Sequence, residues 1–277
     1  MKYTNLYSLP EAYVNVITRH NQKPLPGVMR ASALPDSPQI DRLRRKHWDE
    51  ITIDVSEQIW SLLGTSVHYV LQKGAPKDSF TEEEMTIPID GVILTAHSDM
   101  YHNKIISDYK VTSVFAFFLG EKPTWIGQLN IYAWMWRKYG YPVDRLLIYA
   151  ILRDWMRGKT LSDPDYPKIP FIEEPVPLWT MEEQEKYILE RINIHRDPTL
   201  GCTDQERWMR PTTYACMKEG NKKATRVFDT PQKAEEYIKW NNPKLILVER
   251  KGSYARCEGN YCNVAEFCWQ WAGAVTG

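Results

Sequence analysis

The sequence predicts an α/β fold in which a helix, a three-stranded antiparallel meander, a second helix and a further strand form the core. Apolar residues recur at helical spacing through Asp54–Gln72 and again through Thr124–Tyr139. Between these helices, the pair Asp90-Gly91 separates two β-rich runs, which is a strong hairpin signal. Arg145–Arg153 is almost continuously apolar, as expected of a strand that is buried on both faces. We expect helical additions at both ends of this core.

Composition limits the classes of protein that the chain can represent. With 277 residues and 43% hydrophobic content, it can form one sizeable core or two small ones. The 35 basic and 35 acidic residues cancel, which argues against a protein that coats long DNA non-specifically but leaves room for a local basic groove. No run approaches the ~20 apolar residues of a membrane span, and the polar first residues show no secretory signal. We therefore expect a soluble cytoplasmic protein of a bacterial or phage-infected host cell.

The first helix carries a glycine and a histidine four residues apart. Gly64 and His68 therefore lie on one helix face. A single histidine on an amphipathic helix is usually a packed or surface residue, and the alternative is a metal ligand. Because glycine has no Cβ, we expect Gly64 to let the helix approach the sheet closely.

Acidic residues stand at the ends of the predicted meander strands. Three glutamates, at 82–84, precede the first strand, and we interpret them as a solvated strand entry. Asp90 is interpreted as the turn residue of the hairpin. Asp99 follows the second strand and is the candidate ligand of this segment. Nearby His97 is interpreted as a surface residue.

The third strand of the meander, Lys104–Lys110, carries the clearest chemistry. Asp108 and Lys110 are two residues apart, so both side chains are on one strand face. A surface strand could carry the same pair. Carboxylates from Asp99 and Asp108 suit Mg²⁺ or Mn²⁺, which activate water and polarise a phosphoryl oxygen. Lys110 beside them could orient or deprotonate that water, or stabilise developing negative charge.

The second helix presents Gln128 and Tyr132 four residues apart on its apolar stripe. Tyr132 is compatible with an ordinary core position. Gln128 is harder to explain as core, because a buried amide needs hydrogen-bond partners.

The order of these motifs, G-x-x-x-H, Asp, D-x-K and Q-x-x-x-Y, resembles the RecB-like exonuclease branch of the PD-(D/E)XK nuclease superfamily. That branch includes CRISPR-associated and phage recombination nucleases, and the resemblance covers roughly Ile51 to Arg153. It implies a restriction-endonuclease-like core over residues 51–160. Residues 1–50 would then be an N-terminal helical and loop extension, and residues 161–277 a C-terminal helical extension with a cysteine cluster, packed on the core.

The resemblance also implies an activity and its partners. The protein would be a metal-dependent deoxyribonuclease, an exonuclease of recombination, repair or phage DNA processing. It would act on DNA single strands or duplex ends, together with a recombination or single-strand-annealing partner protein. The alternatives are a structure-selective endonuclease and a non-catalytic nucleic-acid-binding protein. An acid–base pair acting on a sugar is disfavoured, because Lys110 would keep both neighbouring carboxylates ionised.

The roles of individual residues follow from the same resemblance. Mg²⁺ or Mn²⁺ would be bound by His68, Asp99, Asp108 and the backbone carbonyl of Tyr109. Lys110 would assist the water, while Gln128 and Tyr132 would position the lysine or contact the nucleic acid. The chain departs from the family where Ala96 replaces a glycine that relatives often have.

The five cysteines all lie after residue 200. Cys257, Cys262 and Cys268 fall within a dozen residues, and thiolates so close in sequence favour zinc or an iron–sulfur cluster. A fourth ligand would be Cys202, since Cys216 has apolar neighbours and is expected to be a small buried hydrophobe. Similar nucleases carry a [4Fe-4S] cluster on four cysteines, although in many of them the first cysteine precedes the G-x-x-x-H motif. An iron–sulfur cluster, Zn²⁺ and no metal therefore stay open.

Overall fold

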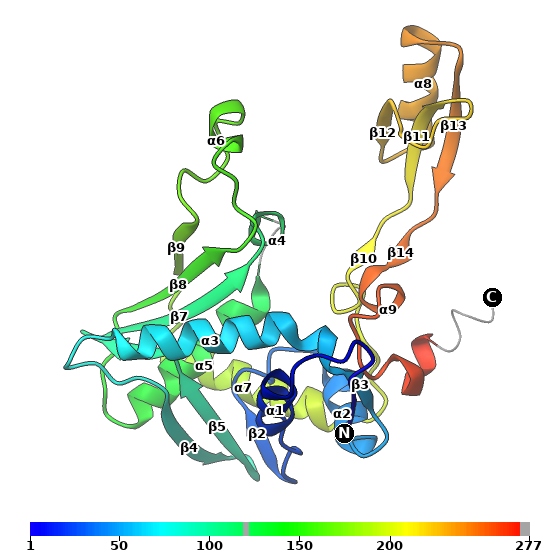
Figure 1. Ribbon diagram of the computed structural model, residues 1–277. Coiled ribbons are helices and arrows are strands. Elements are labelled where there is room, and N and C mark those ends of the chain that lie inside the picture. Colours follow the sequence, from blue (N-terminus) through cyan, green and yellow to red (C-terminus); the bar gives the residue numbers. More distant parts are fainter. Residues whose placement is uncertain (119–121, 272–277) are drawn as a thin grey trace. The chain divides into compact units, whose positions relative to one another are not determined.

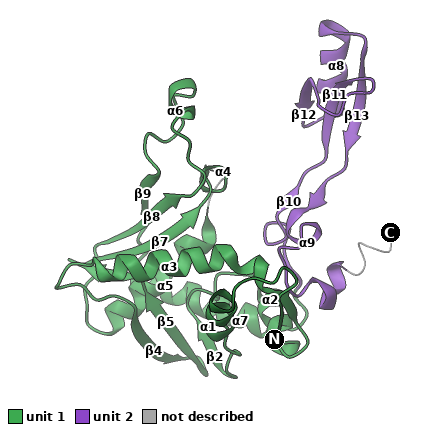
Figure 2. Ribbon diagram, in the orientation of Figure 1, with its two compact units in different colours: residues 1–200 green, residues 201–277 purple. Residues whose placement is uncertain are grey.

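The computed structural model describes residues 1–118 and 122–271 (Figure 1). The chain divides into two units, residues 1–200 and residues 201–277, which are coloured separately in Figure 2. The segment 161–200 belongs to the first unit. The three-part organisation expected from the sequence stays a prediction.

The first unit is a mixed α/β structure. Its strands are β1 (Lys2–Thr4), β2 (Val28–Arg30), β3 (Thr52–Asp54), β4 (Glu83–Ile89), β5 (Val92–Ser98), β6 (Met100–His102), β7 (Ile105–Thr112), β8 (Arg145–Leu152) and β9 (Phe171–Val176). They form a sheet of order β2-β5-β4, a sheet of order β6-β7-β8-β9 and the parallel pair β1-β3. Strand β7 pairs antiparallel with β6 and parallel with β8.

The helical elements of the first unit are α1 (Glu11–His20), α2 (Pro38–Lys46), the 3₁₀ turn η1 (Val55–Gln58), α3 (Ile59–Lys73), α4 (Val114–Phe118), α5 (Pro123–Lys138), α6 (Lys159–Ser162) and α7 (Met181–Arg196). They include both predicted helices, the second as α5 and the first as α3 preceded by a 3₁₀ turn. Helix α5 supplies buried residues all along its length, and it packs on β7, β8 and α7. Helix α3 is also apolar, yet none of its side chains is fully buried.

The predicted hairpin is confirmed, and the predicted continuous meander is wrong. Strands β4 and β5 pair antiparallel around Asp90 and Gly91, whose φ angles of 45° and 70° fit a two-residue turn of this kind. The chain then changes sheet at Asp99, and β6 rather than β5 pairs with β7. The physical reason is that the Asp99 carboxylate, in place of a strand carbonyl, accepts the backbone N–H of Tyr109.

The proline-rich segment before α7 contains a further strand. Its residues Phe171–Val176 form β9, which pairs antiparallel with β8 at the edge of the sheet. An edge strand tolerates Pro175 because one side of its backbone needs no ladder partner.

The second unit contains two small sheets. Its elements are β10 (Met209–Arg210), β11 (Thr213–Lys218), β12 (Arg226–Phe228), α8 (Pro231–Asn241), β13 (Leu245–Arg250), β14 (Ser253–Tyr254), α9 (Ala255–Glu258) and the 3₁₀ turn η2 (Ala265–Phe267). Strands β12-β11-β13 form one sheet and β10-β14 the other. Cys216, Ala234 and Leu245 form the buried centre between α8 and the larger sheet, so the expectation that Cys216 is a buried hydrophobe is confirmed. No helix in the described parts of the chain is long and apolar enough to span a membrane.

Candidate metal and active site

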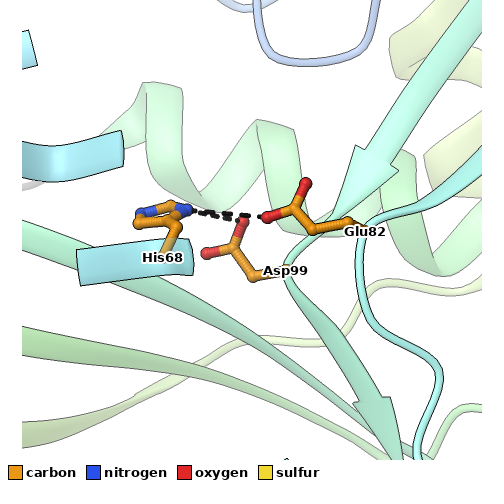
Figure 3. Close-up of side chains that lie close together, drawn as sticks. All are labelled: His68, Glu82 and Asp99. Atoms are coloured by element: carbon orange, nitrogen blue, oxygen red, sulfur yellow. Dashed lines mark ion pairs between the residues drawn. The ribbon is translucent and has the colours of Figure 1, made fainter. Parts of the chain in front are cut away.

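Three potential metal ligands converge in the first unit. His68 comes from α3, Glu82 immediately precedes β4, and Asp99 lies between β5 and β6 (Figure 3). Each offers one ligand atom, and these atoms all lie within 4.8 Å of one another. His68 Nδ1 is 3.2 Å from Asp99 Oδ1 and 3.9 Å from Glu82 Oε1. A ring nitrogen and two carboxylates are a donor set that suits a divalent cation such as Mg²⁺ or Mn²⁺.

The backbone N–H and carbonyl of Tyr109 hold two of these ligands in place. Its N–H donates to Asp99 Oδ2 at 2.7 Å, and its carbonyl oxygen accepts a hydrogen bond from His68 Nε2 at 2.9 Å. The hydrogen bond to Asp99 raises the pKa of His68, despite the opposing effect of burial. Both side chains are therefore oriented by a strand backbone, which is a rigid support.

Glu82 is the functional candidate that sequence reasoning missed. Its φ angle is +53°, in the left-handed region that costs a non-glycine residue about 1–2 kcal/mol. The pairing of the strands holds this conformation, because the Glu82 N–H donates to the Ser98 carbonyl at 3.0 Å. Burial raises the pKa of Glu82, and the Asp99 charge raises that pKa further. The expected solvated strand entry is thus wrong for Glu82, while Glu83 and Glu84 are exposed.

A second polar group lies at the same strand, β7. Lys110 Nζ is 2.6 Å from Asp108 Oδ2 and donates to Gln128 Oε1 at 3.3 Å. The amide of Gln128 donates to Asp108 Oδ1 at 3.2 Å and to Tyr132 Oη at 2.8 Å. Gln128 thus has the partners that a buried amide needs, and it holds the acid and the lysine in one arrangement.

Asp108 is the most strongly perturbed carboxyl of this group. It is 1% exposed, and burial raises its pKa to about 6, against the lowering effect of Lys110. The Lys110 ammonium group, 2.6 Å from Asp108 Oδ2, is the cationic partner of this oxygen. A buried carboxylate is a fitting ligand for a cation, because its charge needs compensation in the protein interior.

The two groups form one electrostatic unit. The charge of Asp99 raises the pKa of Asp108, and that of His68 lowers it. Burial also raises the pKa of Tyr132, which keeps this hydroxyl neutral beside the carboxylates. The structure therefore brings together every residue that the motif order pointed to in the core: His68, Asp99, Asp108, Tyr109, Lys110, Gln128 and Tyr132.

Two further sequence expectations concern residues beside the site. A Cβ atom added to Gly64 would meet nothing within 4 Å, so the expected close approach of this glycine to the sheet is wrong. The missing side chain instead leaves open space along α3. His97 is exposed, as expected of a surface residue.

The cysteine segment lies in the second unit. Cys257 and Cys268 are buried and Cys262 is partly buried. Burial raises the pKa of the Cys262 thiol, against the lowering effects of the Val264 backbone and of Arg256. Cys202 is connected to the same segment through two backbone hydrogen bonds with the amide of Gln270, at 2.7 and 3.0 Å. Within residues 1–118 and 122–271, no three of these cysteines have sulfur atoms that all lie within 4.8 Å of one another, unlike the ligand atoms of His68, Glu82 and Asp99.

Comparison with known proteins gives only distant likenesses. No family model matches the chain, and no curated protein matches its sequence. The crystal structure of SSO0001 is similar at 16% identity, over 72% of this chain and 89% of that one, with a TM-score of 0.47. An alkaline exonuclease from Laribacter hongkongensis has 12% identity over 61% and 88% of the two chains, with a TM-score of 0.37. A phage-related exonuclease from Haemophilus somnus 129PT has 17% identity over 60% and 78%, with a TM-score of 0.31. These values are low, so we base the functional conclusion on the site itself.

Proposed function

We propose that the protein is a metal-dependent nuclease that hydrolyses phosphodiester bonds in DNA. The observation that carries this proposal is the set of contacts made by the backbone of Tyr109. Its N–H and carbonyl connect to Asp99 and His68, while the flanking residues, buried Asp108 and partly exposed Lys110, form an acid–lysine ion pair. Three consecutive residues of β7 thereby contact the candidate metal ligands and supply the lysine.

The donor set fits a hard divalent cation. Carboxylates of Asp99 and Glu82 would hold Mg²⁺ or Mn²⁺ together with His68, and the buried carboxylate of Asp108 is a further candidate ligand. The Tyr109 carbonyl, expected from the sequence to be a further ligand, would instead orient His68 through the hydrogen bond from Nε2. When bound, such an ion activates water and polarises a phosphoryl oxygen.

The remaining residues have roles that follow from their contacts. Lys110 is partly exposed, with 21% of its side chain accessible, so its ammonium group can reach a substrate phosphate. Asp108 and Gln128 hold that ammonium in place, which lets it orient the attacking water and stabilise developing negative charge. Tyr132 in turn supports the amide of Gln128. An exonuclease acting on single strands or duplex ends is the specific form we propose, on the basis of the motif order.

The test is the degradation of end-labelled single- and double-stranded DNA in Mg²⁺, Mn²⁺ or EDTA. We expect cleavage by the wild-type protein that depends on metal, and a loss of roughly 10²-fold or more in Asp108→Ala and Lys110→Ala. Glu84→Ala is the matched control, because Glu84 is an exposed acid close to the site in sequence. Product lengths distinguish an exonuclease from an endonuclease. Absence of cleavage by the folded, metal-supplied wild type overturns the proposal and leaves a protein that only binds nucleic acid.

The cysteines form a second, structural part of the proposal. We propose that Cys202, Cys257, Cys262 and Cys268 hold a [4Fe-4S] cluster, with Zn²⁺ as the alternative. The supporting observation is the position of the last three cysteines within twelve residues, together with the connection of Cys202 to their segment through Gln270. A brown preparation that loses its visible absorbance in Cys262→Ser supports the cluster, and a colourless protein with stoichiometric zinc supports the alternative.

A further inference from the structure

The outer face of α3 carries an exposed aromatic residue that the catalytic proposal does not use. Trp60 lies in the first turn of α3 and is 56% exposed. The guanidinium group of Arg153 lies over its ring, with Cζ 3.9 Å from the ring centroid. Arg153 directly follows β8, and its N–H donates to the carbonyl of Thr112, the last residue of β7. The helix that carries His68 and the strand that carries Asp108 and Lys110 are thus joined again at this pair.

Position along α3 relates this pair to the metal ligands. Trp60, Gly64 and His68 follow one another at intervals of four residues, and each interval rises about 6 Å and turns by about 40°. Trp60 is therefore roughly 12 Å from His68 along the helix axis. At Gly64, midway between His68 and Trp60, no atom would lie within 4 Å of a side chain's Cβ, so this part of the helix surface is open.

Charge around the pair favours an anionic ligand. The segment that follows β8 carries Arg153, Arg157 and Lys159, all exposed. The only acidic residue within 153–159 is Asp154, whose carboxylate accepts the N–H of Val114 at the start of α4. Three basic residues against one acid give the stretch 153–159 a net positive charge.

An indole ring that is stacked with a guanidinium group is the combination on which single-stranded nucleic acids bind. Bases stack on exposed aromatic rings whatever their sequence, and arginine adds a cation–π contribution. A solitary exposed apolar residue would need no explanation. Here the ring has a fixed cationic partner and lies on the helix that carries His68, with open surface at Gly64 between them. Paired bases of a duplex are already stacked on their neighbours and cannot use such a platform.

We propose that Trp60 and Arg153 form a stacking platform for an unpaired base, which makes single-stranded nucleic acid the preferred substrate of this site. The inference rests on the proposed nuclease function for the position of the scissile phosphate, which lies at the metal ligands. The strand runs over Gly64, and one of its bases stacks at Trp60.

The experiment compares binding of two labelled oligomers of equal length and charge, an oligothymidylate and an abasic strand, with Ca²⁺ in place of Mg²⁺. We expect the wild-type protein to bind the oligothymidylate more tightly. Trp60→Ala should weaken that binding at least about fivefold, the lower end of the contribution of one stacked base, and leave the abasic strand unaffected. Trp60→Phe should keep part of the difference. Arg153→Lys keeps the charge but removes the planar group, and it should also reduce the preference for bases.

Tyr69→Ala is the matched control. Tyr69 is 61% exposed on the same helix, nine residues from Trp60 and therefore on the opposite helix face. Thermal unfolding of each variant verifies that it is folded. If Trp60→Ala and Tyr69→Ala bind both oligomers like the wild type, the platform is overturned.

Failure of this inference is distinguishable from failure of the proposed function. If cleavage depends on metal and is lost in Asp108→Ala, but binding does not depend on bases, the nuclease proposal stands and the platform proposal fails. If binding depends on bases and this dependence is lost in Trp60→Ala, but the wild type cleaves nothing, the platform proposal stands and the nuclease proposal fails.

Discussion

Glu82 is the site residue whose role can be tested most directly. If a divalent ion lies among ligand atoms that are within 4.8 Å of one another, its charge is no farther than about that distance from the Glu82 carboxylate. Glu82 is partly exposed, with 37% of its side chain accessible, so the dielectric constant of bulk water gives a conservative lower bound. Coulomb's law then gives about 1.7 kcal/mol for a double and a single charge. We therefore expect Glu82→Gln to weaken Mn²⁺ binding by at least about tenfold.

Isothermal titration of Mn²⁺ measures this effect, and Glu83→Gln is the control. Glu83 is the next residue and also carries a carboxylate, but it is exposed and not part of the ligand group. Without metal, Glu82→Gln should be at least as stable as the wild type, because the repulsion between Glu82 and Asp99 is removed. Equal Mn²⁺ affinity in the two variants would refute the assignment of Glu82 as a ligand, and with it the reasoning from its strained backbone.

Two predictions concern stability. Gly127→Ala should destabilise the fold, because the new Cβ would lie 2.9 Å from Cζ of Tyr187. Overpacking costs about 1–3 kcal/mol, which exceeds the helix-propensity gain of up to about 1 kcal/mol. In urea unfolding, the effects of Gly127→Ala and Tyr187→Ala on the free energy should not be additive. Asp54 accepts hydrogen bonds from Ser56 and from the Leu6 N–H, and these bonds lower its pKa in the folded protein. Its contribution is therefore fully present above the unfolded pKa of about 3.9 and disappears as the pH falls through the lower folded pKa. Urea unfolding should show Asp54→Asn less stable than the wild type at neutral pH, with a difference that shrinks in acid; a difference that is independent of pH would contradict this account.

Local signals made part of this fold predictable from the sequence. Helix α5 and strand β8 follow from their apolar patterns, and the β4–β5 hairpin follows from Asp90-Gly91, because the information for each lies within the segment itself. Glu82 could not be found in this way. Three consecutive glutamates are equivalent in sequence, and only the first has a positive φ, at the point where its N–H pairs with Ser98 at the end of β5.

The failure of the predicted meander has a different origin, and it concerns the site itself. A continuous meander would place a strand against the whole edge of β7. Strand β6 instead covers only Ile105–Ser107, so the edge of β7 is open from the next residues onward. Tyr109 then has an N–H and a carbonyl that no neighbouring strand uses, and Asp99 and His68 take them. Strand periodicity assigns residues to faces, but it carries no information about which backbone groups lack a partner. Departures from regular strand pairing are expected at functional sites. Here the unpaired part of the β7 edge connects the ligand group to the acid–lysine pair.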